Sequence, residues 1–284
     1  MTAHPQPATT QAKPGTIVEK ERGLRSMMRD LESVLVAYSG GVDSTYLAAV
    51  ASSELGDRAL AVMGLSPSVS LFEREEAMAT ALACGFPFET VDTFEMESSD
   101  YQANRADRCF HCKSELYETL GRFAESRGYA GVFDGTNADD LMDHRPGRVA
   151  AAEHGVISPL ADLGFTKSEI RERSRELGLR TWDKPAAPCL SSRVAQGTPV
   201  SIERLDKVER GEALLRDAGF REFRLRVHGD IARIEIAAAE MDSPTAFETL
   251  RVLADKVEAL GFRFVALDLK GFRSGSLNSR AAIK

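Results

Sequence analysis

The chain has 284 residues, 43% of them hydrophobic, and carries a net charge of −7 at pH 7. This length allows one large domain or two modest ones with an ample core. The acidic balance argues against a broad nucleic-acid-binding surface, which normally has a basic excess, so a small-molecule substrate is expected. Because the sequence has neither a run of about 20 apolar residues nor a signal-peptide core, we expect no membrane partner and a cytoplasmic location.

The first part of the chain combines a polar tail with alternating strands and helices. Residues 1–16 are rich in Pro, Thr, Ala and Gln and are expected to be a disordered tail. A first domain is expected over residues 17–184. Its apolar runs predict strands at 35–38, 59–65, 88–91 and 131–134, and helices are expected at 45–55, 71–83, 113–127 and 167–177. This alternation predicts an α/β fold with a parallel sheet, helices on both faces, and ligands at the carboxyl ends of the strands.

The pattern changes at residues 184–199, a loop interrupted by prolines and a glycine. A second domain is expected over residues 185–284. Ser201 can cap a helix that runs to about residue 218. Two strands, a helix and a further strand are then expected at 223–227, 231–237, 244–260 and 262–269. This order predicts a small α+β domain with an antiparallel strand pair, which we expect to bind substrate and to support oligomerisation.

A loop of small residues follows the first predicted strand: Ser39, Gly40, Gly41, Val42, Asp43 and Ser44. The two glycines can take backbone angles that other residues resist, so successive N–H groups can point into one concavity at the start of the helix. The helix dipole favours an anion there, the serine hydroxyls can donate hydrogen bonds, and Asp43 can orient the loop or a bound metal. This sequence resembles the SGGxDS signature of the PP-loop ATP pyrophosphatases, which cleave ATP between the α- and β-phosphates and adenylate a substrate oxygen.

A second polar loop follows the predicted strand at 131–134. It contains four candidate ATP-binding residues, Thr136, Asn137, Asp139 and Asp140. Either aspartate can help to hold magnesium, which bridges phosphate oxygens. The alternative is a helix cap with surface acids. The segment GTNADD resembles a second motif of the PP-loop enzymes, which favours the functional interpretation.

Four cysteines in a cytoplasmic chain are not expected to form structural disulfides. Cys109 and Cys112 form a CxxC pair, and Cys189 lies in the proline-containing loop. Three converging thiols can hold three irons of a [4Fe–4S] cluster and leave the fourth iron open. Zinc is the rival metal, with His111 as a possible fourth ligand. Cys84 is expected to be an inert thiol, and the others have the same alternative.

Basic neighbours bear on the reactivity of these thiols. Arg108 and Lys113 flank the CxxC pair, and this electropositive setting favours the thiolate form. Arg193 follows Cys189 closely, so exposure and a lowered pKa are both plausible for that cysteine.

An alternating strand in the second domain carries two arginines. Arg224 and Arg226 are expected on the same side of this strand, where two guanidinium groups can grip phosphate or carboxylate. Glu209 and Glu212 share a face of the preceding helix and can orient the arginines, with Glu212 expected to be nearer. The alternative is a solvated strand face.

Seven segments occur in the order expected of the LarE-type sulfur transferases: SGGVDSTYLA, RCFHCK, DGTNADD, SPLADLGFTKSEIR, WDKPAAPCLSSR, RVHGDIARIEI and GFRSGSLN. The chain resembles this family over nearly its whole length after the tail. Members thiolate the two carboxylates of a pyridinium biscarboxylic acid mononucleotide, which yields the precursor of the nickel-pincer cofactor of lactate racemase. The resemblance implies an ATP- and Mg²⁺-dependent homo-oligomeric enzyme whose partners are other enzymes of this cofactor's biosynthesis.

The resemblance also implies a mechanism. ATP binds at the glycine loop, the substrate carboxylate attacks the α-phosphate, and magnesium pyrophosphate leaves, so that an acyl-adenylate forms. A sulfur nucleophile then displaces AMP. The substrate phosphate or carboxylate is held by Ser192, Arg193, Glu212, Arg224 and Arg226.

The sulfur source divides the family. In the sacrificial form, the cysteine corresponding to Cys189 attacks the adenylate, and elimination leaves its sulfur on the product and dehydroalanine in the protein. Other members bind a [4Fe–4S] cluster through a CxxC pair and this cysteine, and draw sulfide from the open iron. The presence of Cys109 and Cys112 favours the cluster form here.

Three alternatives share the ATP loop. A PP-loop tRNA thiolase also combines SGGxDS with cluster cysteines, but the acidic charge weighs against RNA. An amide-forming ligase of the GMP or NAD synthetase type would not need the three cysteines. A non-catalytic adenylate-binding module would bind AMP without exchanging pyrophosphate into ATP.

Overall fold

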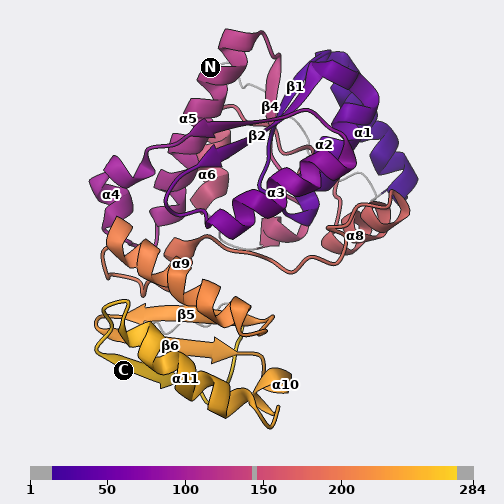
Figure 1. Ribbon diagram of the computed structural model, residues 1–284. Helices are drawn as coiled ribbons and strands as arrows, with labels where there is room; N and C mark the ends of the chain where they lie inside the picture. The colour runs from indigo at the N-terminus through magenta and orange to yellow at the C-terminus, as the bar shows by residue number, and fades with distance from the viewer. Residues whose placement is uncertain (1–14, 143–145, 274–284) are drawn as a thin grey trace, which may run out of the picture.

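The computed structural model describes residues 15–142 and 146–273, which form two sheets with their helices (Figure 1). The strands of the first sheet are β1 (Val34–Ala37), β2 (Ala59–Leu65), β3 (Phe88–Asp92) and β4 (Gly131–Phe133). The α-helices of this part are α1 (Ile17–Leu31), α2 (Val42–Leu55), α3 (Leu71–Cys84), α4 (Ser99–Gln102), α5 (Arg108–Arg127), α6 (Pro146–Glu153), α7 (Pro159–Asp162) and α8 (Lys167–Glu176). Among these described residues, no helix is long and apolar enough to cross a membrane.

The first sheet is parallel and has the strand order β3-β2-β1-β4. The chain moves outward from β1 to β3 and then returns to the other side of β1 to form β4. The crevice between the carboxyl ends of β1 and β4 is therefore a topological switch point, where open α/β sheets bind ligands. The predicted α/β fold with a parallel sheet is confirmed.

Helices cover both faces of this sheet, because the central strand is apolar on both sides. Val34 and Val36 belong to a core cluster shared with α1, α2 and α8. Leu35 points to the opposite face, where it belongs to a second cluster with residues of α5 and α6. Figure 1 shows α1 and α2 on one side of the sheet and α5 and α6 on the other.

Three helix starts differ from the sequence-based expectation. Helix α1 was not expected, although Thr16 caps it and forms a capping box with Glu19. Most of the predicted tail, residues 1–14, lies outside the described residues. Helix α2 begins at Val42 rather than residue 45. Helix α5 begins at Arg108 rather than Lys113, so the CxxC pair lies on its first turn.

The second sheet has the strand order β5-β6-β7. Its part of the chain comprises α9 (Ile202–Asp217), β5 (Phe223–His228), β6 (Ile231–Ile236), α10 (Ala238–Met241), α11 (Ala246–Glu258) and β7 (Phe264–Leu267). Strands β5 and β6 are antiparallel, and β7 joins β6 in parallel. Apolar residues of β5 and β6 pack with α9 and α11 in a third core cluster. The expected α-β-β-α-β order with an antiparallel pair is confirmed; the last residues of the GFRSGSLN segment lie outside the described residues.

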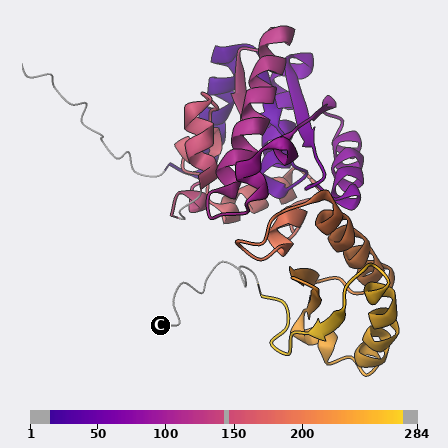
Figure 2. The same cartoon turned by 90° about the vertical axis from the view of Figure 1, so that its left-hand side faces the viewer.

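The loop before α9 contacts residues that surround the first sheet and residues of the second sheet's core (Figure 2). The Leu190 N–H donates to the carbonyl of Ser68, 2.8 Å away, in the loop that follows β2. The hydroxyl groups of Tyr101 and Ser191 are 2.6 Å apart. Tyr101 and Leu190 both belong to the core cluster of the second sheet. The segment that carries Cys189 is therefore held between the two parts of the molecule.

Candidate active site

The loop after β1 contains one glycine with a positive φ. Gly40 has a φ of 70°, and a Cβ atom there would lie 2.7 Å from the Cβ of Ala77 on α3. The backbone angle and the close approach of α3 both require glycine. Gly41 has a φ of −83° and is the N-cap residue of α2. The expectation of an unusual backbone angle is therefore wrong for Gly41, whose φ is accessible to other residues.

The predicted phosphate-binding residues gather at the N-terminus of α2. The Oγ of Ser44 accepts the Ser39 N–H at 3.2 Å, and the two hydroxyl oxygens are 3.1 Å apart. Asp43 pairs with the Nζ of Lys167 at 2.5 Å and accepts a hydrogen bond from the Asn137 side chain at 3.3 Å. Because first-turn N–H groups have no partner within a helix, this end of α2 suits an anion.

The loop after β4 faces this turn across the switch point. Asp134 is buried, and its carboxylate accepts hydrogen bonds from the hydroxyls of Tyr117 and Thr136, each at 2.8 Å. A Cβ on Gly135 would lie 3.0 Å from the Ser44 nitrogen, so the two loops approach closely. Burial, together with the adjacent Asp134, raises the pKa of Tyr117, so its hydroxyl remains a proton donor.

Asn137 organises the acidic end of this loop. Its Oδ1 accepts the backbone N–H of Asp139 at 2.9 Å and that of Asp140 at 3.2 Å. The Asp139 carboxylate accepts the backbone N–H of Lys167, the first residue of α8, at 2.8 Å. Asp139 therefore contacts the first turn of α8, whose N-cap residue is Thr166, and it also lines a cavity together with Asp140.

Two cavities meet at the glycine loop. The first, of ≈ 290 Å³, lies between the loops after β1 and β4, and its lining includes Val62, Lys113, Leu116, Tyr117, Asp134 and Thr136. The second, of ≈ 390 Å³, has a lining that includes Glu73, Asn137, Asp139, Lys167, Lys184 and Ala186. Ser39, Asp43 and Asp140 line both cavities. A linear ligand can therefore extend from one cavity into the other past the N-terminus of α2.

Several lining residues were missed by sequence reasoning. Lys167 and Lys184 occur in the family-like segments SPLADLGFTKSEIR and WDKPAAPCLSSR, but nothing local assigns them a ligand. Tyr117 lies inside the predicted helix at 113–127. It lies one turn after Lys113, which lines the same cavity, so helical periodicity places the two side chains on one face. The sequence carries this spacing, but nothing in it shows that this face borders a cavity.

The three candidate cluster cysteines lie where α5 meets the loop before α9. Cys109 is exposed, whereas Cys112 and Cys189 are half-buried. Burial raises the pKa of Cys112, and the nearby charges of Cys189, Glu95 and Cys109 raise it further. The expectation that basic neighbours favour a thiolate is therefore wrong for Cys112, because these effects outweigh the opposing charge of Lys113. Arg108, the neighbour of Cys109, donates to the Ser191 carbonyl at 2.7 Å, two residues after Cys189, so the first turn of α5 lies beside the loop that carries Cys189.

Whether these residues can hold a metal depends on the atoms that they offer as ligands and on how these atoms are arranged. In the part of the chain that the structure describes, no group of three His, Cys, Asp or Glu side chains is arranged to hold a metal ion. The donor chemistry nevertheless fits an iron–sulfur cluster, because three neighbouring thiols supply the ligand type that such clusters use. The Arg108 guanidinium lies 4.0 Å from the Cys109 sulfur. His111 contacts Asp107 at 3.5 Å.

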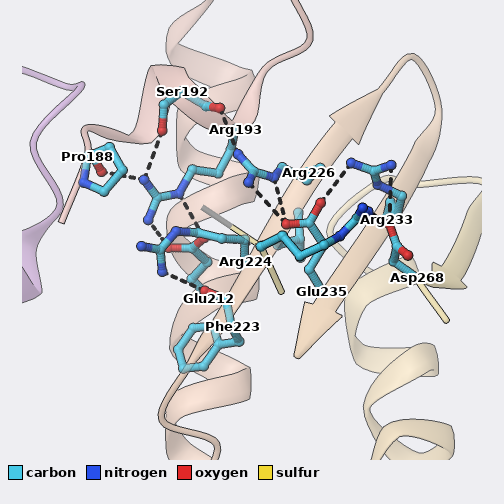
Figure 3. A network of polar contacts seen from close by, with 12 residues as sticks. Pro188, Ser192, Arg193, Glu212, Phe223, Arg224, Arg226, Arg233, Glu235 and Asp268 are labelled. Carbon is cyan, nitrogen blue, oxygen red and sulfur yellow. Dashed lines mark hydrogen bonds and ion pairs between the residues drawn. The ribbon is translucent and has the colours of Figure 1, made fainter. Parts of the chain in front are cut away.

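Figure 3 shows the arginines of the second sheet together with the loop before α9. Arg193 pairs with Glu212 through two hydrogen bonds of 2.9 and 3.1 Å. Arg226 pairs with Glu235 at 3.0 Å and donates to the carbonyl of Ser192 at 3.0 Å. All four charged side chains are buried. These arginines therefore hold the loop on the sheet through compensated ion pairs.

Arg224 differs from its neighbours. It lies on the same sheet face as Arg226, as expected, and donates to the carbonyls of Phe223 at 2.6 Å and Ala186 at 3.4 Å. Among the described residues, no carboxylate forms an ion pair with it. Burial and the nearby charge of Arg193 lower its pKa to about 10. Arg224 is therefore the arginine whose positive charge is left for an anionic ligand.

Glu209 and Glu212 of α9 have different roles. Glu212 lies among the arginines, as expected, where it accepts hydrogen bonds from Arg193 and from the Leu225 N–H at 3.2 Å. Glu209 does not orient the arginines, so that expectation is wrong. Its carboxylate accepts the N–H of Leu71 and so connects α9 to the start of α3.

The contrast between Arg224 and Arg226 gives a prediction. Arg226→Met should lower the free energy of unfolding by about 1–3 kcal/mol, because the fully buried Glu235 carboxylate loses this partner but keeps Arg233 at 2.8 Å. Arg224→Met removes a charge that forms no ion pair among the described residues, although Glu212 and Glu235 lie nearby, so stability should stay within about 1 kcal/mol of the parent or rise. Urea denaturation of both variants measures the difference. Equal losses in the two variants would contradict this distinction.

Comparison with known proteins places the chain in a family, although no family model matches it. It is 45% identical to an uncharacterized protein of Synechocystis sp. over 259 residues, which are 91% of this chain and 97% of that protein. It is 35% identical over 264 residues to the pyridinium-3,5-bisthiocarboxylic acid mononucleotide synthase of Lactiplantibacillus plantarum, covering 93% of this chain and 95% of the relative. One subunit of the glutamine-hydrolyzing GMP synthase of Thermoplasma acidophilum is 28% identical over 199 residues, 64% of this chain and 63% of that subunit.

The parallel sheet and the glycine loop after its first strand define an α/β enzyme of the PP-loop ATP pyrophosphatase type, consistent with the likeness to the GMP synthase subunit. The chain belongs to the family of the pyridinium-3,5-bisthiocarboxylic acid mononucleotide synthases, because the identity extends over nearly all of both chains. The family resemblance drawn from the order of the motifs is thereby confirmed.

Proposed function

We propose that this enzyme uses ATP to adenylate the carboxylates of pyridinium-3,5-biscarboxylic acid mononucleotide and converts them to thiocarboxylates for the nickel-pincer cofactor of lactate racemase. One observation carries the proposal: the loop with Cys189 connects the nucleotide cavities to the arginines. Residues 185–187 of this loop line the second cavity, and Arg193 near its end pairs with Glu212. ATP and the substrate would then bind at the two ends of one short segment, with Cys189 between them.

The residues of the site have distinct roles in this proposal. The first cavity takes the adenosine part of ATP, and the N-terminus of α2 with Ser39 and Ser44 binds the phosphates. Asp43, Asp139 and Asp140 supply oxygen ligands for magnesium, which proteins commonly hold with one or two carboxylates together with substrate phosphates. Asn137 positions these acids through its hydrogen bonds, and Thr136, which donates to the neighbouring Asp134, is proposed to contact the nucleotide.

The substrate is proposed to lie beside the second sheet. Arg224 binds its phosphate or a carboxylate, while Arg193, Arg226 and Glu212 hold Ser192 and the loop in place. A substrate carboxylate oxygen attacks the α-phosphorus, and the bond to the β-phosphate oxygen breaks, so pyrophosphate leaves and an acyl-adenylate forms. A sulfur nucleophile then attacks the acyl carbon, and AMP leaves with the electron pair of the broken carbon–oxygen bond.

Two sulfur sources fit the cysteines. In the sacrificial mode, the Cys189 thiolate attacks the acyl carbon. Loss of its Cα proton and cleavage of the Cβ–sulfur bond then leave dehydroalanine and the thiocarboxylate. In the cluster mode, which we favour, Cys109, Cys112 and Cys189 would hold a [4Fe–4S] cluster. Such a cluster supplies an open iron able to bind exogenous sulfide.

Iron analysis separates the two modes. After anaerobic reconstitution, we expect about four iron and four acid-labile sulfide atoms per chain, as for one [4Fe–4S] cluster. Alanine variants at Cys109, Cys112 and Cys189 should each lose them, whereas Cys84→Ala should not. A parent chain without bound iron would assign the sulfur to Cys189 itself.

The test of the overall function uses the mononucleotide substrate and ATP. Pyrophosphate exchange into ATP should require the substrate, and mass spectrometry should show sulfur in place of carboxylate oxygen. The likeness to a GMP synthase subunit makes an amide-forming ligase the second candidate. Incorporation of ammonia instead of sulfur would favour that candidate. Exchange that depends on tRNA would favour a tRNA thiolase.

The proposal extends to the organisation of the protein. We place the domain boundary between residues 184 and 185, with ATP bound by the first domain and the substrate mainly by the second. We further propose a cytoplasmic homo-oligomer whose partners are the other enzymes of nickel-pincer cofactor biosynthesis.

A further inference from the structure

Two lysines line the second cavity, and each is paired with a carboxylate of the same cavity. The Nζ of Lys167 lies 2.5 Å from the Oδ2 of Asp43, and the Nζ of Lys184 lies 3.0 Å from the Oε2 of Glu73. The side chain of Lys184 is only 16% exposed. Its ammonium group is thus largely withdrawn from solvent, in a cavity large enough to admit a ligand.

The backbone of Lys184 is fixed while its side chain remains able to change partner. Arg171 donates hydrogen bonds to the carbonyls of Trp182 and Lys184, each at 2.9 Å. The Lys184 N–H donates to the carbonyl of Thr181 at 3.0 Å. Because lysine has a long stem that ends in a point charge, the ammonium group can move between nearby anions without movement of this backbone.

The position of the second cavity relative to the first suggests which ligand the second cavity binds. The two cavities meet at Ser39, Asp43 and Asp140, beside the N-terminus of α2. If the first cavity holds the nucleoside, as in the proposed function, ATP extends past this helix end. Cleavage between the α- and β-phosphates would leave the pyrophosphate in the second cavity, next to the two lysines.

We infer that Lys184 is a pyrophosphate-binding residue that exchanges Glu73 for a phosphate oxygen when ATP binds. This inference rests on the proposed function. The exchange keeps charges compensated, since the magnesium that accompanies pyrophosphate provides positive charge for Asp43, and the Glu73 side chain, which is 26% exposed, is left to solvent. When magnesium pyrophosphate leaves, Lys184 returns to Glu73. Lys184 also begins the loop that carries Cys189, so pyrophosphate contacts the first residue of the thiol-bearing segment.

Calorimetric titration of the full chain with magnesium pyrophosphate tests the inference. Lys184→Met should weaken binding about tenfold or more, the effect of losing one hydrogen bond between charged groups. Lys184→Arg, which keeps the charge, should restore most of the affinity. AMP should bind all variants as it binds the parent, because its single phosphate belongs to the first cavity.

Two variants serve as controls. Glu73→Gln leaves the Lys184 ammonium group without its partner, so pyrophosphate should bind this variant as tightly as the parent or more tightly. Lys207→Met breaks a comparable pair, in which Lys207 lies 2.7 Å from Glu203 on α9 outside both cavities, and should change nothing. If Lys184 only ties the loop to α3, Lys184→Met and Glu73→Gln will weaken binding equally, and the inference is overturned.

The two proposals can fail separately. Undiminished pyrophosphate binding by Lys184→Met would reject the role of Lys184 while the parent still catalyses substrate-dependent exchange. A parent chain that neither binds magnesium pyrophosphate nor catalyses that exchange would reject the proposed function itself.

Discussion

Asp43→Asn is expected to reduce substrate-dependent exchange of pyrophosphate into ATP by about 100-fold or more, as removal of a charge-stabilising group from an active site commonly does. The substitution preserves the shape of the side chain but removes the charge that pairs with Lys167. It also removes an oxygen ligand proposed for magnesium. Exchange of labelled pyrophosphate measures adenylation separately from sulfur transfer, so the loss should appear in this assay.

The matched control for this prediction lies just beyond the other end of the same helix. Asp57 is exposed in the short turn that follows α2, far from the glycine loop along the helix. Asp57→Asn should leave exchange at the parent rate. Thermal unfolding would verify that both variants are folded. Exchange near the parent rate in Asp43→Asn would remove Asp43 from the ATP site.

Cys189→Ser should abolish formation of the thiocarboxylate while pyrophosphate exchange continues. Both proposed sulfur sources need this thiol, either as the sulfur donor or as a cluster ligand. The glycine loop and the first cavity contain no atom of Cys189, so adenylation should not depend on it. Mass spectrometry of the product and of the protein measures both outcomes. In the sacrificial mode, the parent protein alone would show dehydroalanine.

Cys84→Ser is the control for the thiol prediction. Cys84 is the last residue of α3 and is half-buried, and burial raises its pKa, so its thiol is a poor nucleophile. Product formation should be unchanged in this variant. Thiocarboxylate made by Cys189→Ser at the parent rate would show that the sulfur comes from elsewhere.

The sheet could be predicted because its strands are short apolar runs that alternate with helix formers. The run at 35–38 differs from β1 by one residue at each end, and 59–65 coincides with β2. The missed helix α1 had a local signal, since Thr16 and Glu19 have the spacing of a capping box. That Leu24 and Met28 are core residues becomes clear only from the packing of α1 on α2.

The pairing of charged residues could not be predicted in the same way. The alternation of β5 placed Arg224 and Arg226 on one face, but it could not show which of them meets a carboxylate. The register of the antiparallel strands β5 and β6 places Glu235 directly opposite Arg224, yet its carboxylate pairs with the diagonal neighbour Arg226. The residue roles in the ATP site, including those of Thr136 and Asn137, are proposals, and Asp43→Asn tests the role of Asp43.

Helix α5 contributes to both halves of the proposed chemistry. Its first turn carries Cys109 and Cys112, and Leu116 and Tyr117 in the following turns line the first cavity. At 1.5 Å per residue, the helix separates Cys112 from Tyr117 by roughly 7 Å along its axis. Neither Cys109 nor Cys112 lines the first cavity, so a change confined to these two residues would alter the supply of sulfur but leave the contacts of Lys113, Leu116 and Tyr117 in place. We therefore expect that evolution within the family can replace one sulfur source by another without rebuilding the machinery that activates the carboxylate.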